Sequence, residues 1–407
     1  MTKYELKFKS FNSNLELVMG GSKSISQRSL IIRFLRLSNK KLNNISNSND
    51  TRTLNKILNN LKSEINVKDG GTTLRFLLCA LSLEKKSFFI DGDLSLAKRP
   101  LKNLIVNLQK LGVNFTFHSK KYQIPLTIKG ANLKFNELII DSNESSQFAS
   151  GLALIAPYVK GGLRLKINRK IVSKSFFDMT IKMMKSCGIN MTLNKKFIVI
   201  KESPYLKNYD NIESDWTSLS YIYQIIAFSK NKSIKCSKFK INSLQGDSVL
   251  INFFSIVGVK TFFRKNYVYL QKNEGFKKPL FIHLDISDTP DLAFTYIITC
   301  LGLSIKLKLT GIETLKFKES NRLFVMKKEL EKLNVKVVLR NNFFSMNPVN
   351  KNLQNLKIDT HFDHRVALSF APLVIISKNI IIKNPEVVNK SYPEFWTHLK
   401  KIGIKIS

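Results

Sequence analysis

The chain has 407 residues, of which 43% are hydrophobic, so it can form two or three globular domains, and no apolar run reaches the roughly 18 residues that span a membrane. Its four cysteines are scattered among apolar residues without the spacing of a zinc site, and its N-terminus lacks an apolar signal segment. The formal net charge of +37 would suit a nucleic-acid-binding protein, but the lysines are dispersed and only 12 of the 66 cationic residues are arginine, which favours a general surface bias.

One pattern recurs along the chain: an amphipathic helix, a small turn residue and a short alternating strand. The first copy, at residues 58–67, is irregular and has its turn near Glu64. The five clear copies have a glycine or an asparagine at the turn, namely Gly112, Gly188, Gly258, Asn334 and Gly403. These residue types suit the left-handed conformation that ends many helices. We therefore predict six α/β units, three before residue 213 and three after it.

The grouping of the repeats predicts two similar domains. Flexible points at Gly20-Gly21 and near residues 211–215 mark a boundary that the chain crosses twice. If the chain crosses this boundary twice, its first residues belong to the same domain as the C-terminal half. We expect one domain at residues 21–213 and the other at residues 1–20 plus 214–407, with a cleft between them.

Polar motifs stand at the expected helix starts of the N-terminal half. Residues 20–28 combine glycines, hydroxyls and two cations, which is typical of an anion site, although an ordinary capped helix has the same residues. Residues 69–75 contain two glycines that let the backbone approach a ligand closely. Residues 98–100, 145–147 and 173–178 precede three more helices, and each of these motifs taken singly is better explained as a helix cap.

The C-terminal half has four such motifs, at residues 288–291, 318–322, 363–365 and 390–393. Asp291 stands beside the longest apolar run of the chain, where a carboxylate needs a partner. A cation near a helix N-terminus opposes the helix dipole, so its recurrence in both halves predicts a bound anion. The cations at these positions are Lys23, Arg28, Arg75, Arg99, Arg322, Arg365 and Lys390.

Together, and in this order over nearly the whole chain, the motifs resemble those of the 3-phosphoshikimate 1-carboxyvinyltransferase (EPSP synthase) family. The resemblance implies an α/β fold of two similar domains, each made of three βαβαββ units with approximate threefold symmetry. This architecture is an inside-out α/β barrel with the active site in the interdomain cleft. The N-terminal domain would be the shikimate 3-phosphate side and the C-terminal domain the phosphoenolpyruvate side.

The resemblance also implies an enzyme of the shikimate pathway of aromatic amino-acid biosynthesis, which leads to chorismate. It would transfer the enolpyruvyl group of phosphoenolpyruvate to the 5-hydroxyl of shikimate 3-phosphate and release phosphate, with neither a cofactor nor a metal. The implied catalytic residues are Asp291 as base and Glu319 as acid, with Lys23 nearby. The implied phosphoenolpyruvate ligands are Lys23, Gly71, Arg99, Gln147, Arg322, Arg365 and Lys390. The implied shikimate 3-phosphate ligands are Lys23, Ser24, Arg28, Ser145, Ser146, Gln147, Ser173, Asp291 and Lys318.

Some residues depart from the family's usual pattern, and we expect full activity with weaker binding. Phe176 replaces a frequent tyrosine, Asn321 a common aspartate, and Gln27, Asp69-Gly70 and Thr314 also differ. The nearest alternative is UDP-N-acetylglucosamine 1-carboxyvinyltransferase, whose loop cysteine has no counterpart in residues 93–98. A basic nucleic-acid-binding protein is a remote alternative. We expect a cytoplasmic monomer that binds neither nucleic acid nor membrane.

Overall fold

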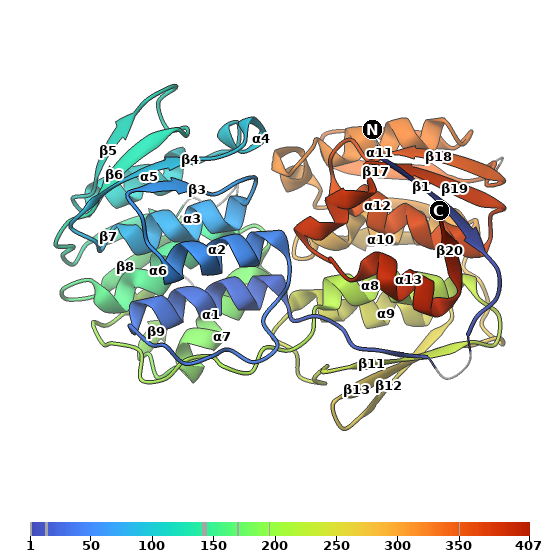
Figure 1. The fold of residues 1–407 in the computed structure, drawn as a ribbon, viewed down its shortest axis with the longest axis horizontal. Coiled ribbons are helices and arrows are strands. Elements are labelled where there is room, and N and C mark those ends of the chain that lie inside the picture. Colours follow the sequence, from blue (N-terminus) through green and yellow to red (C-terminus); the bar gives the residue numbers. More distant parts are fainter. Residues whose placement is uncertain (1, 13–14, 141–144, 169–170, 195, 350) are drawn as a thin grey trace. The chain divides into compact units, whose positions relative to one another are not determined.

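The computed structural model describes residues 2–12, 15–140, 145–168, 171–194, 196–349 and 351–407 of the chain. The chain divides into two compact units (Figure 1). The N-terminal unit is Ser22–Ile212, and the C-terminal unit joins Glu213–Ser407 to the segment that ends at Gly21. Gly21 pairs with Ser214 in an isolated bridge, so Gly21 and Glu213 belong to the C-terminal unit.

The C-terminal unit contains three four-stranded sheets with one topology. In each sheet the first two strands of a βαβαββ unit pair in parallel, and the last two strands add in antiparallel order. The sheet orders are β2-β11-β13-β12, β14-β15-β17-β16 and β18-β19-β1-β20. The strands are β1 (Lys3–Phe8), β2 (Glu16–Leu17), β11 (Ser233–Ser237), β12 (Val259–Arg264), β13 (Tyr267–Lys272), β14 (Phe281–Asp285), β15 (Lys306–Thr310), β16 (Lys336–Leu339), β17 (Phe343–Asn347), β18 (Asn355–Asp359), β19 (Asn379–Lys383) and β20 (Ile404–Ile406).

The start of the chain completes two of these three sheets. β2 pairs in parallel with β11, where Leu17 lies opposite Cys236. β1 lies between β19 and β20 and pairs antiparallel with both, so that Leu6 is opposite Ile380 on one side and Ile406 on the other. Leu6 and Leu17 are fully buried, and their burial ties the first residues to the C-terminal unit.

The N-terminal unit has two sheets of the same topology among its described residues, ordered β3-β4-β6-β5 and β7-β8-β10-β9. The third set of elements there contributes the helices α1 (Lys23–Leu35) and α2 (Asn49–Asn59), and in the described part of the chain its segments at Asn43 and Asn211 pair in a parallel bridge. The strands are β3 (Glu64–Asn66), β4 (Ser87–Asp91), β5 (Asn114–Phe117), β6 (Leu126–Lys129), β7 (Glu137–Ile140), β8 (Leu163–Ile167), β9 (Met191–Leu193) and β10 (Phe197–Ile200).

The five clear copies of the helix-turn-strand pattern are confirmed. Each turn residue has a positive φ, from 58° at Asn334 to 113° at Gly403, and each separates a helix from a strand. The irregular copy at residues 58–67 is wrong. Its helix ends at the extended residue Asn60, and Glu64 begins β3, which pairs in parallel with β4 and so starts the next unit.

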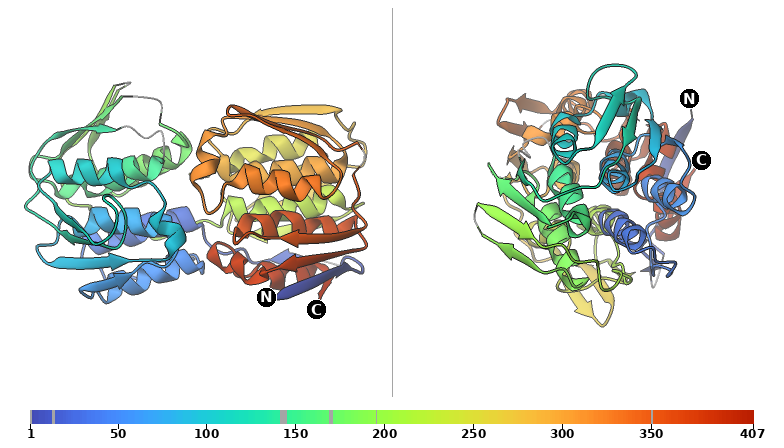
Figure 2. Two further views of the ribbon diagram at one scale, coloured as in Figure 1. Left: turned by 90° about the horizontal axis from the view of Figure 1, so that it is seen from above. Right: turned by 90° about the vertical axis from the view of Figure 1, so that its left-hand side faces the viewer.

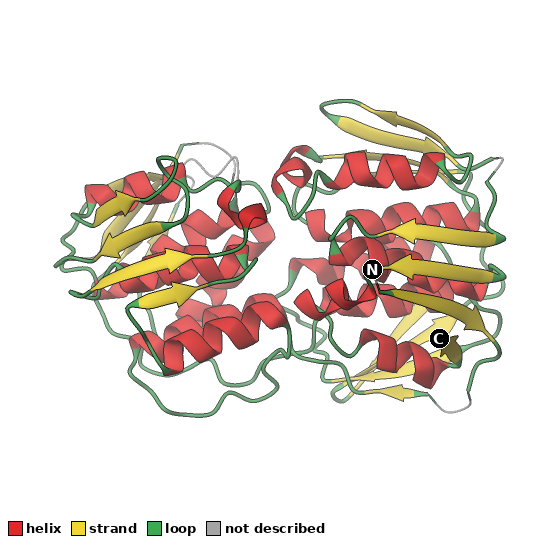
Figure 3. Cartoon of the chain, turned by 45° about the horizontal axis from the view of Figure 1, so that its top comes forward, coloured by secondary structure: helices red, strands yellow, loops and turns green. Residues whose placement is uncertain are grey.

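Helices occupy the interior of each unit, and the sheets lie on their outer side (Figures 2 and 3). This arrangement confirms the predicted inside-out α/β fold. The inner helices are α1 (Lys23–Leu35), α3 (Gly71–Leu81), α6 (Ser146–Ile155), α8 (Trp216–Phe228), α10 (Ala293–Leu303) and α12 (His364–Phe370). The other helices are α2 (Asn49–Asn59), α4 (Leu94–Ala97), α5 (Lys102–Lys110), α7 (Lys174–Ser186), α9 (Leu250–Ile256), α11 (Arg322–Glu331) and α13 (Phe395–Ile402).

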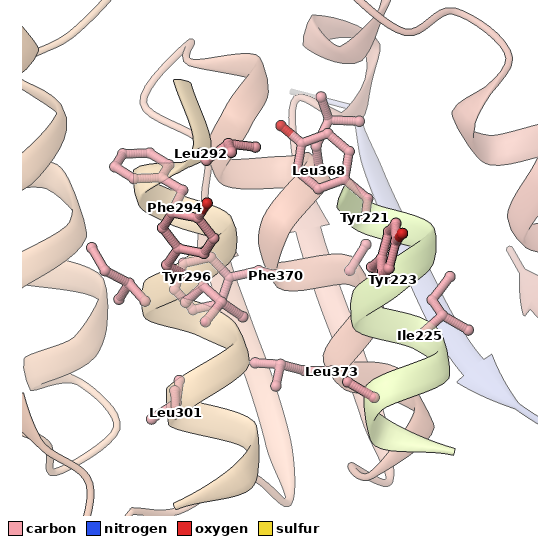
Figure 4. Packing of buried hydrophobic residues seen from close by; sticks show 14 of the residues in the cluster. Tyr221, Tyr223, Ile225, Leu292, Phe294, Tyr296, Leu301, Leu368, Phe370 and Leu373 are labelled. Atoms are coloured by element: carbon pink, nitrogen blue, oxygen red, sulfur yellow. The ribbon is translucent and has the colours of Figure 1, made fainter. Parts of the chain in front are cut away.

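The inner helices of the C-terminal unit form its core (Figure 4). Every residue of α12, and every residue of α10 from Ala293 to Leu301, is buried. Tyr221 and Tyr223 from α8, Phe294 from α10 and Phe370 from α12 supply much of the aromatic surface there. A helix that is apolar all round must be covered on every side, which explains why these three pack together. Among the helices described, none combines the length and the hydropathy of a membrane span.

Candidate active site

In the N-terminal unit, α3 and α6 are exposed at their N-terminal turns alone. All of α3 is buried except Thr72, and all of α6 is buried except Gln147. The amide Nε2 of Gln147 donates to the hydroxyl of Thr72 at 2.6 Å, so these two residues are adjacent. Ser145 caps α6, because its Oγ accepts from the backbone N–H of Gln147 at 3.2 Å. Two helix N-termini therefore meet where an anion can use their N–H groups.

Arg75 connects three of the polar motifs. Its Nη1 donates to Oε1 of Gln147 at 2.8 Å, and its Nη2 donates to the carbonyl of Pro100 at 3.0 Å. Arg75 is buried, so these bonds fix the start of α6 relative to the loop that carries Arg99. In the sequence Arg75 stands out as a cation at a helix start, but it is not among the ligands that the family resemblance implies.

Gly71 lies directly against two guanidinium groups. A Cβ added to Gly71 would be 2.6 Å from Nη1 of Arg99 and 3.0 Å from Nη1 of Arg75. The first contact is shorter than a side chain tolerates, so glycine lets Arg99 approach the first residue of α3. The predicted residues Gly71, Arg99 and Gln147 thus share one neighbourhood.

Lys23, the first residue of α1, forms an ion pair within the same unit. Its ammonium is 3.1 Å from Oδ2 of Asp50, which is buried in α2. The carbonyl of Asp50 accepts the hydroxyl of Thr73, and that hydroxyl oxygen accepts the amide of Gln27 at 3.1 Å. Asp50 was missed from the sequence because it lies in an ordinary helix start, where an aspartate is expected on helix-dipole grounds alone.

Arg28 is embedded in the interior, with 1% of its surface exposed. Its Nε donates to the hydroxyl of Thr180 at 2.6 Å, and its Nη2 donates to the carbonyl of Phe176 at 2.9 Å. Burial lowers the pKa of its guanidinium to about 9. Arg28 therefore joins α1, which contains the predicted residue Ser24, to α7, which the predicted residue Ser173 precedes. The carbonyl of Ser24 accepts from its Nη1 at 2.8 Å, while Ser173 precedes α7 with a left-handed φ of 53°.

In the C-terminal unit, one buried arginine binds three carboxylates. Arg322, the first residue of α11, donates from Nε to Asp363 at 3.0 Å, from Nη1 to Asp291 at 3.0 Å and from Nη2 to Glu319 at 2.6 Å. Its side chain is 2% exposed. The three acceptors come from three separate motifs, so one guanidinium assembles them.

Asp291 is shared among three cations. Its Oδ2 is 2.8 Å from Nη2 of Arg365, and its Oδ1 is 3.6 Å from the ammonium of Lys318 as well as 3.0 Å from Arg322. Burial alone would raise the pKa of Asp291, but Arg365, Lys318 and Arg322 outweigh it and hold that pKa well below its usual range. The same burial lowers the pKa of Lys318, and its own partner Asp291 offsets this only in part.

Arg365 is oriented by its helix and by a tyrosine. Asp363 caps α12 by accepting the backbone N–H of Arg365 at 3.0 Å, and Nη1 of Arg365 donates to the hydroxyl of Tyr221 at 3.2 Å. Lys390 is buried at the end of the 3-10 turn Pro385–Lys390, which packs against α12. The structure thus brings together Asp291, Lys318, Glu319, Arg322 and Arg365 by direct contacts and places Lys390 on the neighbouring segment.

Asp247 is a buried carboxylate that is not among the site residues predicted from the sequence. It lies in the 3-10 turn Gly246–Val249 and accepts a hydrogen bond from the hydroxyl of Thr217, which is partly buried while the rest of α8 is buried. Burial, reinforced by the charge of Asp291, raises the pKa of Asp247 to about 7. Nothing in its local sequence marks it, since only the fold brings it close to the Asp291 cluster. Within the described residues, no group of three or more His, Cys, Asp or Glu side chains is arranged to hold a metal ion.

The fold is that of the enolpyruvyl transferases. The chain superposes on an EPSP synthase from Acinetobacter baumannii with a TM-score of 0.79 and 19% sequence identity, over 100% of both chains. It also superposes on the enolpyruvyl transferase NikO from Streptomyces tendae with a TM-score of 0.76 and 10% identity, over 100% of this chain and 98% of that one. At these identities the likeness establishes the fold.

Sequence comparison identifies the family. The family model for EPSP synthase (3-phosphoshikimate 1-carboxyvinyltransferase) matches residues 64–399. A 3-phosphoshikimate 1-carboxyvinyltransferase of Bacteroides fragilis (strain YCH46) is 34% identical over 388 residues, which cover 95% of this chain and 94% of the relative. One from Buchnera aphidicola subsp. Cinara cedri is 30% identical over 413 residues, with 94% and 93% covered. The chain belongs to this family, which confirms the predicted transferase activity and shikimate-pathway role and does not favour the UDP-N-acetylglucosamine alternative.

Proposed function

We propose that the two sets of polar residues act on one pair of substrates, shikimate 3-phosphate and phosphoenolpyruvate. Each substrate carries a phosphate and a carboxylate, so the site must neutralise at least four anionic groups. The N-terminal unit provides the hydroxyls and helix N-termini that suit shikimate 3-phosphate. Its ligands are Lys23, Ser24, Arg28, Ser145, Ser146, Gln147 and Ser173, and the C-terminal unit adds Asp291 and Lys318.

Phosphoenolpyruvate binds to cations from both units. Arg322, Arg365 and Lys390 belong to the C-terminal unit, whereas Lys23 and Arg99 belong to the N-terminal unit, as do the proposed ligands Gly71 and Gln147. Guanidinium groups suit this role because their forked donors match the oxygens of phosphate and carboxylate.

The observation that carries the proposal is the set of carboxylates on Arg322 and Arg365. Asp291, Glu319 and Asp363 accept hydrogen bonds or form ion pairs with the guanidinium donors that we assign to the substrate anions. A bound phosphate competes for the same donors. The phosphate then neutralises part of the positive charge around Asp291, and the pKa of Asp291 rises from its lowered value toward the usual range.

This exchange couples substrate binding to proton transfer. Asp291 accepts the proton of the 5-hydroxyl, whose oxygen attacks C2 of phosphoenolpyruvate, while Glu319 delivers a proton to the CH2 carbon. In the second step Glu319 takes back a proton from the new methyl group, the C–O bond to phosphate breaks, the double bond is restored, and the departing phosphate takes the proton held by Asp291. Fixed cations stabilise the charge on the departing phosphate. A positioned acid and base contribute about 10²–10⁴-fold each to the rate.

The test is phosphate release from both substrates by the wild type and by Asp291→Asn and Glu319→Gln. We expect each variant to lose about 10²–10⁴-fold in kcat. Glu331→Gln is the matched control, because Glu331 lies on the same helix as Arg322 and pairs with Lys327 on the surface. Retention of kcat within tenfold by Asp291→Asn would show that Asp291 is not the base.

We also propose that the protein acts as a cytoplasmic monomer. Size-exclusion chromatography with light scattering should give a mass near 46.7 kDa. Twice that mass at micromolar concentration would contradict the monomer.

A further inference from the structure

A strained turn leads into the motif that carries Asp363 and Arg365. β18 ends at Asp359 and α12 starts at His364, and two consecutive residues between them have left-handed backbones. His361 has a φ of 48° and Phe362 a φ of 57°. Histidine is found in this region more often than most residues, but the bulky Phe362 is not, so its conformation is unfavourable and persists only where the surroundings impose it.

Glu329 provides that constraint from the far end of α11. Its side chain is fully buried, and its Oε1 lies 2.8 Å from Nε2 of His361. Its Oε2 accepts the backbone N–H of Asp359 at 3.3 Å. Asp359 in turn accepts the backbone N–H of His361 at 2.9 Å. The half-exposed ammonium of Lys332 also pairs with this carboxylate, at 2.5 Å from Oε1.

α11 therefore contacts the turn on both sides. Arg322, at the start of α11, binds Asp363, which follows the two left-handed residues. Glu329, near the end of α11, binds Asp359, which lies before them, and His361, which is the first of them. Arg322 and Glu329 are seven residues apart and so lie on one face of the helix. These contacts fix the position of the turn relative to α11. Asp363 connects the two arginines, because it binds Arg322 and caps α12, the helix that carries Arg365.

We propose that Glu329 and His361 are positioning residues, which hold the left-handed turn against α11 and thereby set the places of Arg322 and Arg365 relative to each other. The inference rests on the proposed function, in which these two arginines bind the phosphoenolpyruvate anion. Neither Glu329 nor His361 touches the substrate. Their contribution is to keep two guanidinium groups at the spacing that a single anion requires.

The test compares two neighbouring substitutions. Asparagine tolerates a left-handed backbone, so His361→Asn keeps the turn conformation but removes the contact with Glu329. Phe362→Asn is the matched control, because Phe362 is 71% exposed and the substitution keeps that contact. We expect His361→Asn and Glu329→Gln to raise the KM for phosphoenolpyruvate about tenfold, with a smaller change in kcat. Phe362→Asn and Lys332→Met should leave this KM within twofold.

Two further measurements separate this role from plain stabilisation. The KM values are compared after urea unfolding has established that each variant is folded at the assay temperature. His361→Asn is also combined with Arg322→Lys, and the double variant should lose less than the product of the two single losses, since both act on one guanidinium. Multiplicative losses, or an unchanged KM in folded His361→Asn, would overturn the inference. Failure of the proposed function looks different, because Asp291→Asn would then keep its activity.

Discussion

Replacement of Gly71 by alanine tests how closely the guanidinium groups of Arg99 and Arg75 must pack against the first residue of α3. The new Cβ would be 2.6 Å from Nη1 of Arg99 and 3.0 Å from Nη1 of Arg75. Arg75 is fixed by bonds to Gln147 and Pro100, so it has little freedom to move. The guanidinium group of Arg99 must therefore move away from the new Cβ of residue 71.

The size of the effect follows from the geometry. An ordinary contact between a carbon and another heavy atom is about 3.5 Å, so Arg99 has to retreat by roughly 1 Å. A misplacement of that size costs about 10²-fold in a reaction that depends on positioned groups, which corresponds to about 2.7 kcal/mol in the transition state. We expect kcat/KM for phosphoenolpyruvate to fall by about this factor, mainly through KM.

The assay is phosphate release at varied phosphoenolpyruvate and saturating shikimate 3-phosphate. Gly275→Ala is the control, because a Cβ added there has nothing within 4 Å. It should behave as the wild type in the same assay. A KM for phosphoenolpyruvate within twofold of wild type in Gly71→Ala would refute the reasoning, since it would mean that Arg99 can move without loss or does not bind this substrate.

Three other substitutions test the C-terminal unit. Arg322→Gln leaves Asp363 and Glu319 without their buried cation, so urea unfolding should show a loss of about 3–5 kcal/mol, and a loss below 1 kcal/mol would contradict the ion-pair cluster. Asp247→Asn tests the raised pKa of about 7. Because the folded state holds that proton and the unfolded state releases it above about pH 4, wild-type stability should fall by up to about 1.4 kcal/mol per pH unit between pH 4 and 7, and the variant should lack this slope. Leu6→Ala removes a fully buried side chain from the central strand β1 and should cost about 2–5 kcal/mol in the same unfolding assay, whereas Lys7→Ala, at an exposed position, should cost less than about 0.5 kcal/mol.

The sequence was most informative where the structural determinant is local. Gly112, Gly188, Gly258, Asn334 and Gly403 could be identified because a left-handed helix end restricts the residue type at one position. The error at residues 58–67 has the opposite cause. The pattern of a helix followed by a strand is the same whether that strand ends one unit or starts the next, and only the pairing of β3 with β4 decides between the two.

The residues of the candidate site divide in the same way, into those that local sequence reveals and those that only the fold reveals. The cations at helix starts stand out in the sequence because they oppose the helix dipole. Asp50, Asp247 and Glu329 do not stand out, since a single carboxylate in a helix or loop is common and its burial depends on segments far away in the chain. Glu329 and His361 are 32 residues apart, and no short motif connects them.

The pairing of β1 and β2 determines the order in which the chain can fold during synthesis. Ser22–Ile212 form a continuous unit, which can fold as soon as it leaves the ribosome. β1 is made first, yet its partners β19 and β20 are made last, so its edges stay unpaired until translation is nearly complete. The backbone N–H of Glu5 in β1 donates to the carbonyl of Ser407, which follows β20, at 2.9 Å, so these two segments lie side by side. A circularly permuted gene that starts at Glu213 would place every strand of this unit in one uninterrupted stretch.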